Sequence, residues 1–438
     1  MSNIQAYRGS ILHFLRKPES ISDIDSYQFI EDGLLVIESG KINKIDEFCT
    51  ASKILPEGVN IIDYSGYILF PGFIDTHIHF PQLEMIASYG EQLLEWLNNY
   101  VFPTEKKYHN RNYVLEKAHF FIHELLRNGT TTAATYSTVH KISADILFEA
   151  ANEIDMCLIT GKVMMDRNAP DYLLDTPESA YEDSKELIKK WHGKNRLKYA
   201  VTPRFAPTST EAQLEVAKTL TKEFPKVYLQ THLSENRSEL EWIKELYPWS
   251  IDYTDVYEKF DLLGNKSIFG HCIHLTDRAF SAIEESNSIV SWCPSSNFFL
   301  GSGVFNISKA MHHDLNLSIG TDVGGGNRIF MLQALNEAYK AASLRNIKLS
   351  PLHSLYYSTL GNARALKLDK NLGNFSIGKD ADFIVMDPAN TPLMKERAKY
   401  SKTFADKLFG LQMLGDNRTI KATYIYGKLR YKNESIYV

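Results

Sequence analysis

Cysteine is scarce in this sequence, which has four cysteines in 438 residues and no Cys-x-x-Cys pair. Scattered cysteines argue against a disulfide-built scaffold and predict a reduced, cytoplasmic setting. Apolar runs of about 18 residues are also missing, so we predict no membrane span and no membrane partner. The N-terminal stretch lacks the long apolar segment and the small-residue cleavage site of a signal peptide.

The sequence likewise has no excess of positive charge, with 48 Lys and Arg residues against 53 Asp and Glu residues. Proteins that bind nucleic acid usually carry a basic surface, so we expect no nucleic-acid partner. What is present is a chain with 44% hydrophobic residues, enough for a large core. Its length fits one large barrel with a satellite domain.

Both ends of the chain are rich in β-strand signals. GLLVIESGKINKID has a turn at Ser39–Gly40, and DADFIVMD and IKATYIYGKLRY, with a turn at Gly427, follow near the C-terminus. We therefore predict that the two ends pair into one small β-sandwich domain. The expected boundaries are 1–68 for its N-terminal part, 69–372 for a catalytic barrel and 373–438 for its C-terminal part.

The middle of the chain alternates short apolar runs with amphipathic stretches. Apolar residues from Val114 to Leu125 recur at helical spacing, and Gly129 follows as the residue expected just past the helix end. Strands that alternate with helices predict a distorted (β/α)8 TIM barrel, with a doubly wound sheet as the alternative. The eight predicted strands lie in 67–75, 130–136, 156–163, 197–203, 227–232, 267–272, 288–294 and 317–322.

Polar residues stand at the ends of several runs, where a barrel of this kind gathers its functional side chains. His77 and His79 are two residues apart and therefore point to the same face of a strand. His232, His271 and Asp322 end the fifth, sixth and eighth runs. Each alone is explained by a polar residue at a strand–loop junction, but together they predict a metal site. Nitrogen and carboxylate ligands without cysteine favour zinc, with iron or manganese as alternatives.

Four further residues lie beside predicted strand ends. Glu235 follows His232 by three residues and is placed to reach a substrate above the metal, although a helix N-terminal acid would occupy the same position. Arg204 and Phe205 follow the fourth run, where an Arg fork suits a carbonyl or ring nitrogen and Phe stacks on a planar base. The alternative is an exposed Arg and a core Phe. Gln82 offers both donors and acceptors to a purine edge.

Longer motifs connect these residues to a known family. PGFIDTHIH, THLSEN, GHCIH and GTDVGGG resemble the four metal-site motifs of the amidohydrolase superfamily, and GNFSIGKDADFIVMD resembles its return into the terminal β domain. Within the superfamily the sequence is similar to the guanine deaminases, with HIHFPQ, LLEWLNNYVFPTE, NGTTTA, VTPRF, THLSENRSE, LYP and GTDVGGG in the same order. The resemblance extends over about 65–430, and LLEWL–FP and VTPRF are its most specific parts.

The resemblance implies a zinc-dependent hydrolase of purine catabolism that converts guanine to xanthine and ammonia. It implies a cytoplasmic homodimer with one Zn²⁺ per chain. The implied metal ligands are His77, His79, His232 and Asp322. The implied catalytic residues are Glu235 as proton shuttle, His271 beside the attacking water, and Asp322. The implied substrate-binding residues are Gln82, Arg204, Phe205, His232, His271 and Asp322.

Two other functions stay open. The first is the same chemistry on a triazine, a pterin or an adenosine-like nucleoside, against which VTPRF and Gln82 argue. The second is a non-enzymatic scaffold, which would be expected to have lost its metal ligands. The segment 83–103 contains Leu93, Leu94, Trp96 and Leu97. We expect it to cover the site and exclude water, with plain packing of a rim loop as the alternative.

Overall fold

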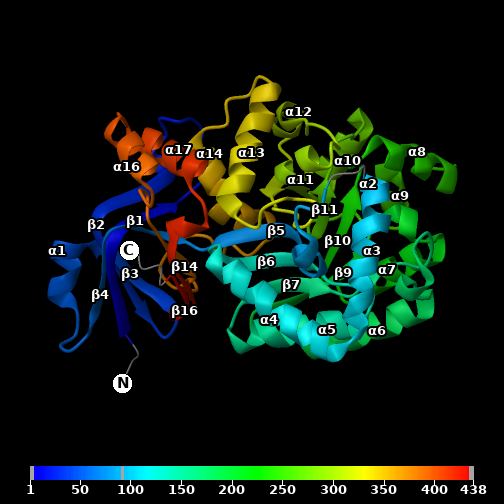
Figure 1. The fold of residues 1–438 in the computed structure, drawn as a ribbon, viewed down its shortest axis with the longest axis horizontal. Helices are drawn as coiled ribbons and strands as arrows, with labels where there is room; N and C mark the ends of the chain where they lie inside the picture. The colour runs from blue at the N-terminus through cyan, green and yellow to red at the C-terminus, as the bar shows by residue number, and fades with distance from the viewer. Residues whose placement is uncertain (1–3, 90–92, 434–438) are drawn as a thin grey trace.

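The larger part of the fold is a barrel of parallel strands (Figure 1). The structure is a computed structural model and describes residues 4–89 and 93–433. Neighbouring strands follow one another in chain order, and the short β8 (Val163–Met164) pairs with β9 beside this path. The barrel strands are β5 (Phe73–His79), β6 (Thr130–Tyr136), β7 (Cys157–Gly161), β9 (Leu197–Pro203), β10 (Tyr228–Leu233), β11 (Ser267–His271), β12 (Ile289–Trp292) and β13 (Asn316–Ile319).

Two hydrogen bonds link the last strand region to the first. The Asp322 N–H donates to the His77 carbonyl at 2.8 Å, and the His79 N–H donates to the Val323 carbonyl at 2.8 Å. The chain just after β13 therefore lies against β5 and brings the two ends of the sheet together. The predicted (β/α)8 barrel is confirmed, and the doubly wound alternative is wrong.

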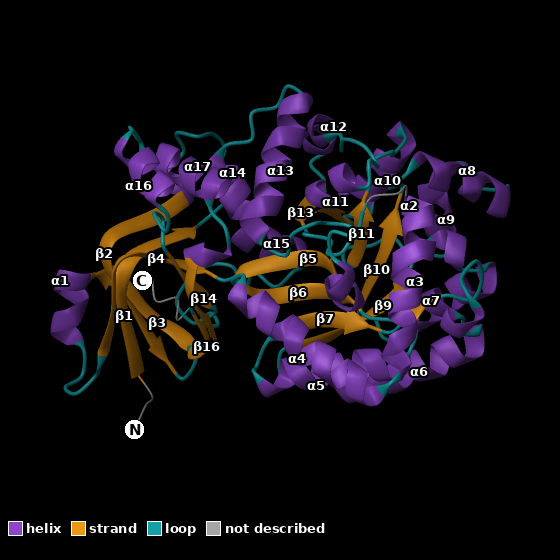
Figure 2. Ribbon diagram, viewed as in Figure 1, coloured by secondary structure: helices purple, strands orange, loops and turns teal. Residues whose placement is uncertain are grey.

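Helices cover the outside of the barrel, as Figure 2 shows. In α4, the Asn110 side chain caps the first turn by accepting from the Asn112 and Tyr113 N–H groups. The expected apolar face is buried, and Gly129 follows with a φ of 79°. The longer helices here are α4 (Arg111–Arg127), α5 (Lys141–Glu153), α6 (Pro177–Trp191), α7 (Glu211–Glu223), α8 (Arg237–Leu246), α9 (Tyr253–Lys259), α10 (Asp277–Glu285) and α13 (Met331–Leu344). The shorter ones are α11 (Pro294–Phe299), α12 (Ile307–His312), α14 (Pro351–Tyr356) and α15 (Asn362–Ala365).

A seven-stranded sheet joins the two ends of the chain beside the barrel. Its order is β16-β15-β14-β4-β1-β2-β3, so C-terminal β14 pairs with N-terminal β4. Leu35 and Ile42 from one end of the sheet share a core with Phe383 and Tyr424 from the other. The predicted terminal β domain is thus one continuous sheet folded over on itself in sandwich fashion. Its strands are β1 (Ile4–Phe14), β2 (Tyr27–Glu38), β3 (Lys41–Glu47), β4 (Ile61–Pro71), β14 (Phe383–Met386), β15 (Ile420–Ile425) and β16 (Lys428–Lys432).

The first predicted barrel strand, 67–75, is divided between the two sheets. Its first part belongs to β4 of the terminal sheet and its last part to β5 of the barrel. The division falls at Gly72, where a Cβ atom would lie 2.1 Å from Thr131 Oγ1, so only glycine fits. The apolar run alone could not reveal this change of sheet, because both strands are buried there.

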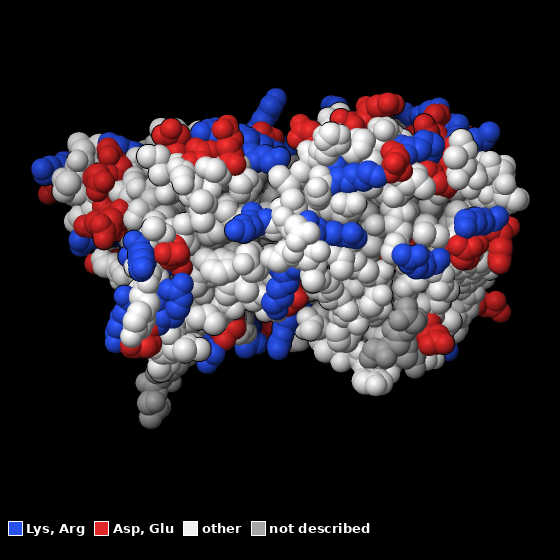
Figure 3. Space-filling view, turned by 90° about the horizontal axis from the view of Figure 1, so that it is seen from above, with Lys and Arg blue, Asp and Glu red and all other residues white. Residues whose placement is uncertain are grey.

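The C-terminal segment holds two helices that the sequence analysis did not predict, α16 (Pro392–Lys399) and α17 (Phe404–Leu414). The domain boundaries after 68 and 372 stay predictions. No helix within the described ranges is both long enough and apolar enough to cross a bilayer. Basic and acidic side chains are mixed over the face seen in Figure 3. All four cysteines are free thiols.

Candidate active site

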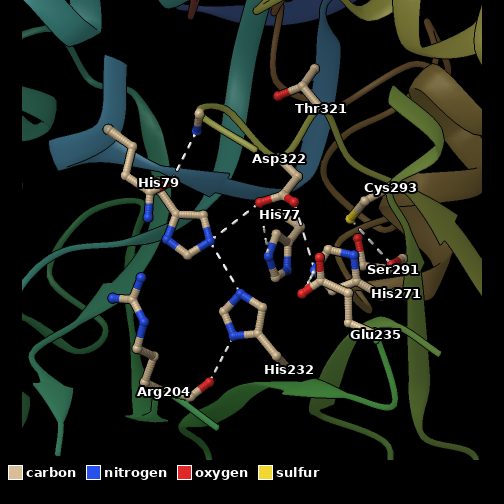
Figure 4. Close-up of polar contacts among 12 residues, drawn as sticks. His77, His79, Arg204, His232, Glu235, His271, Ser291, Cys293, Thr321 and Asp322 are labelled. Atoms are coloured by element: carbon tan, nitrogen blue, oxygen red, sulfur yellow. Dashed lines mark hydrogen bonds and ion pairs between the residues drawn. The ribbon is translucent and has the colours of Figure 1, made fainter. Parts of the chain in front are cut away.

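Three histidines and one aspartate meet at the carboxyl ends of the barrel strands (Figure 4). His77 and His79 end β5, His232 comes from β10, and Asp322 follows β13. Asp322 Oδ1 lies 3.4 Å from His77 Nε2 and 3.2 Å from His79 Nε2. His79 Nε2 lies 3.2 Å from His232 Nε2. The four ligand atoms all lie within 4.8 Å of one another, and all four residues are buried.

Glycine makes room for this cluster on the neighbouring strands. A Cβ atom at Gly270 in β11 would lie 2.5 Å from the His77 ring. A Cβ atom at Gly320 would lie 2.8 Å from the His77 backbone and Cβ. Larger residues at these two positions would therefore displace a ligand, which explains the glycine that begins the GHC motif and the glycine that begins the GTD motif.

The protonation states of these groups suit a cation. Burial lowers the pKa of His79 to about 3 and that of His232 well below its usual value, so both imidazoles are neutral. Burial opposes the charge on Asp322, but His77 and His79 outweigh it and hold the pKa of Asp322 well below its usual range. Both ring nitrogens of His77 are buried without a hydrogen-bond partner. Neutral imidazoles and a carboxylate that converge in this way fit a metal ion of the zinc type.

A second layer of contacts orients the histidine rings. The Nδ1 of His232 lies 2.7 Å from the Arg204 carbonyl oxygen, an acceptor that fixes this nitrogen as the donor. The Nδ1 of His271 lies 2.9 Å from the Asn297 Oδ1. Asn297 belongs to α11, and no spacing or strand-end position in the sequence pointed to it. Cys293, treated in the sequence only as a free thiol, lies beside His77, His271 and Asp322. These contacts leave the Nε2 atoms of His232 and His271 to face the site.

Glu235 lies between the end of β10 and the start of α8. Its Oε2 is 3.3 Å from His271 Nε2, and its Oε1 accepts a hydrogen bond from the Ser302 hydroxyl at 3.3 Å. Burial and the nearby Asp322 raise the pKa of Glu235 to about 8. Glu235 therefore holds a proton at neutral pH and is able to donate it. Ser302 is a further contact that sequence reasoning missed.

A pocket opens over the cluster. It brings together almost all of the residues singled out in the sequence, while His77 lies beneath it. Arg204 and Phe205 enter from the end of β9, and Gln82 enters from the turn η3 (Phe80–Met85). The lining includes His79, Gln82, Leu93, Trp96, Leu97, Arg204, Phe205, His232, Glu235, His271, Leu300 and Asp322.

The apolar wall of the pocket comes from the segment expected to cover the site. Leu93, Trp96 and Leu97 lie in α2 (Leu93–Trp96) and the helical turn η4 (Leu97–Val101), and all three are buried. Residues 90–92 of the predicted cover, 83–103, lie outside the described residues. A closing movement of this segment stays a prediction.

One pocket residue has a partner that sequence reasoning did not single out. Arg204 Nη1 lies 2.8 Å from Oε1 of Glu105, the last residue of α3 (Phe102–Glu105). Both side chains are buried, and burial raises the pKa of Glu105 although Arg204 and Gln82 favour its charged form. The alternative of an exposed Arg204 is wrong. Glu105 stands within the motif LLEWLNNYVFPTE, but no residue pattern there indicates an arginine partner.

Comparison with known proteins places the chain in a family. The model of the amidohydrolase family matches residues 68–430. Guanine deaminase from Escherichia coli (strain K12) is 49% identical over 430 residues, which cover 98% of each chain. The solved structure of E. coli guanine deaminase has a TM-score of 0.96 at 48% identity, covering 98% of this chain and all of that one. A structure of guanine deaminase from C. acetobutylicum with guanine bound in its active site has a TM-score of 0.87 at 30% identity, with 98% of this chain covered. The chain belongs to the amidohydrolase family and, within it, to the guanine deaminases.

Proposed function

We propose that the protein hydrolyses guanine to xanthine and ammonia. The observation that carries the proposal is that one pocket joins a buried His–Asp cluster, an acid with a raised pKa and a pair of base-binding side chains. The relatives named above support the choice of guanine over other amino-heterocycles. Conversion of guanine fits a place in purine catabolism.

His77, His79, His232 and Asp322 would hold one zinc ion per chain. The buried nitrogens of His77 and the Nδ1 of His79, which have no hydrogen-bond partner, and the lowered pKa values of His79 and His232 support this assignment. A bound zinc ion supplies a water of lowered pKa, a good nucleophile at neutral pH. The donor set has no cysteine among these four residues, which favours zinc over softer-ligand metals but leaves the loaded metal to measurement.

The chain's own residues handle the protons of the reaction. Water adds to C2 of guanine, and Glu235 donates its proton to the ring nitrogen next to that carbon. Asp322 accepts the proton that the water loses, while His271 orients the water from the other side. Glu235 then carries the proton of the new C2 hydroxyl to the exocyclic amine, which leaves as ammonia as the C2 carbonyl forms. The proton held on Asp322 returns to Glu235 and restores the starting state. General acid–base catalysis of this kind contributes about 10²–10⁴-fold in rate.

The pocket walls select the base. Phe205 packs against the purine ring, and Arg204 donates to O6 or N7. The Gln82 Oε1 accepts a hydrogen bond from the Gly324 N–H at 3.1 Å. Its amide NH₂ is therefore the group left to donate to acceptor atoms of the base. Adenine would present an amino donor where guanine presents a carbonyl, and we expect adenine to be rejected because two donors cannot pair. Leu93, Trp96 and Leu97 exclude water above the ring.

The setting of the enzyme is part of the same proposal. Free, mostly buried thiols suit the cytoplasm, where cysteines stay reduced. We further propose that the protein works as a homodimer, as the family resemblance implies.

A substrate panel tests the function. Zinc-loaded protein is given guanine, adenine, guanosine or cytosine, and ultraviolet absorbance and ammonia release are followed, with Glu235→Gln as the control. We expect conversion of guanine alone, lost in the control. Turnover of adenine, guanosine or cytosine without turnover of guanine would keep the chemistry and overturn the substrate. Zinc-loaded protein that converts nothing would point to a scaffold.

A further inference from the structure

The base-binding wall of the pocket contains a buried ion pair whose second member does not line the pocket. Glu105 is fully buried, and its Oε1 lies 2.8 Å from Arg204 Nη1. Within the described residues, the bond from Nη1 to Glu105 is the one hydrogen bond or ion pair of the Arg204 guanidinium. An arginine has five N–H donors, so this bond leaves the others free to face a ligand.

Burial raises the pKa of Glu105, while Arg204 and Gln82 favour its charged form. Gln82 Oε1 accepts from the Gly324 N–H at 3.1 Å, which orients the amide. Among the described residues Arg204 is the hydrogen-bond partner of the Glu105 side chain, and Glu105 Oε2 has none. A long flexible arginine loses less conformational freedom on binding when its head is already fixed, so this arrangement prepares the wall before the base arrives.

The position of Glu105 in the chain adds a second link. Helical turns run without interruption from α2 through η4 and α3 to η5 (Lys106–His109). The first part of this helical stretch supplies Leu93, Trp96 and Leu97 to the pocket, and its later part supplies Glu105. The ion pair thus ties the stretch that covers the base to the end of β9 that recognises it.

We propose that Glu105 is a positioning residue that holds Arg204 toward the 6-oxo edge of the purine and so sets the preference for 6-oxopurines. The proposal rests on the proposed function. Glu105 neutralises the guanidinium within the protein, so the wall presents oriented N–H donors to a neutral base without a net buried charge. A free arginine at this place would be mobile and would favour anionic ligands over guanine.

The test compares guanine with 2-aminopurine, which has the same reacting carbon and amine but lacks the 6-oxo group. We would measure kcat and KM for guanine and the inhibition constant of 2-aminopurine in zinc-loaded wild type, Glu105→Gln and Glu95→Gln. Glu95 is an exposed carboxylate of α2 and serves as the matched control. In Glu105→Gln, kcat/KM for guanine should fall by about 10–100-fold, mainly through KM, the loss expected for one charge-assisted hydrogen bond. The inhibition constant of 2-aminopurine should change by less than about threefold, and the control should match wild type.

Equal losses for both bases, or an unchanged kcat/KM for guanine in Glu105→Gln, would overturn the proposal. Arg204→Gln and the double variant Glu105→Gln/Arg204→Gln decide the matter if the single variant does not fold, because the double variant leaves no unpaired buried charge. Adding Glu105→Gln to Arg204→Gln should leave the guanine-to-2-aminopurine preference unchanged within about twofold. A further loss of preference would contradict a role through Arg204. Wild type without guanine turnover would instead overturn the proposed function itself.

Discussion

Each end of strand β9 is flanked by an arginine largely withdrawn from solvent, Arg196 with 12% of its side chain exposed and Arg204 with 4%. The two arginines differ in how they use their donors. Arg196, just before β9, donates to the Asp155 carbonyl at 2.8 Å and to both Asp382 oxygens, and its Nε lies 3.2 Å from Asp380. Arg204, just after β9, donates to one carboxylate among the described residues, that of Glu105. Arg196 lies at the amino end of β9, the closed end, and donates to protein groups. Arg204 lies at the carboxyl end, the open end that carries the pocket, and keeps donors for a ligand. A buried charged group therefore indicates a functional site only where some of its donors or acceptors have no protein partner.

The backbone is strained at the open end of the barrel, where the pocket lies. Ser234, His271 and Asp322 have φ values of 52°, 69° and 50°, in the left-handed region that costs free energy for residues with a side chain. All three stand where barrel strands pass into the loops of the site. The fold tolerates this strain because the surrounding barrel holds these loops, and the strain aims Asp322 and His271 into the pocket.

The largest effect is expected at the open end, from Glu235→Gln. The substitution keeps the size and the hydrogen-bonding oxygen of the side chain but removes its transferable proton. We expect kcat for guanine to fall by about 10²–10⁴-fold. The melting temperature should change by only a few degrees, since a protonated glutamic acid and a glutamine fill similar space. A variant that keeps more than a tenth of wild-type kcat would contradict the role of Glu235.

Arg196→Ala, at the closed end, should lower the stability of the protein and leave its kcat almost unchanged. It leaves Asp382 buried without its cation, whereas Asp380 keeps its ion pair with Lys41, so the free energy of unfolding should fall by about 3–5 kcal/mol. Urea unfolding checks this value, and kcat per folded molecule should stay within about twofold of wild type. A loss of kcat at unchanged stability would break the distinction between the two ends.

A smaller effect is expected from Asn297→Ala, which removes the oxygen beside His271 Nδ1. His271 would then be free to rotate or change tautomer, and such outer contacts are worth about 10–100-fold in activity. Steady-state kinetics measures the loss, and Asn297→Asp, which restores an acceptor oxygen, should recover most of it. Failure of the aspartate to rescue would show that Asn297 acts through packing and not through His271.

The effect of pH is expected to be small near neutrality and to appear only above pH 8. Burial and Asp322 raise the pKa of Glu235 from 4.5 to about 8, so the proton-donating form is present below that pH and is lost above it. We expect kcat to fall by about tenfold per pH unit above 8 as the carboxyl ionises. A pH series from 6 to 10 tests this, and the residual activity of Glu235→Gln should lack the fall. A wild-type rate that is flat through this range would contradict the assignment.

Sequence reasoning located the strand-end residues because their signal is local. His77 and His79 alternate on one strand, and His232, His271 and Asp322 end apolar runs, so strand periodicity places them at one rim of the barrel. The terminal sheet was also predictable, since both ends show strand signals and turns at Gly40 and Gly427.

The supporting contacts could not be predicted in the same way. Glu105 and Arg204 are 99 positions apart, and Asn297 lies 26 positions from His271, so only the closed barrel brings them together. The run 67–75 gave no sign of a change of sheet because the end of β4 and the start of β5 are both buried. Long-range pairings of this kind leave no periodic trace in one sequence.

The central claim is that guanine hydrolysis depends on a metal held by His77, His79, His232 and Asp322. A zinc titration of metal-free protein tests it most directly, with ammonia release from guanine as the signal. The account predicts that activity rises linearly with added zinc and stops rising at one zinc ion per chain. Full activity in the metal-free protein, or none at saturating zinc, would contradict it.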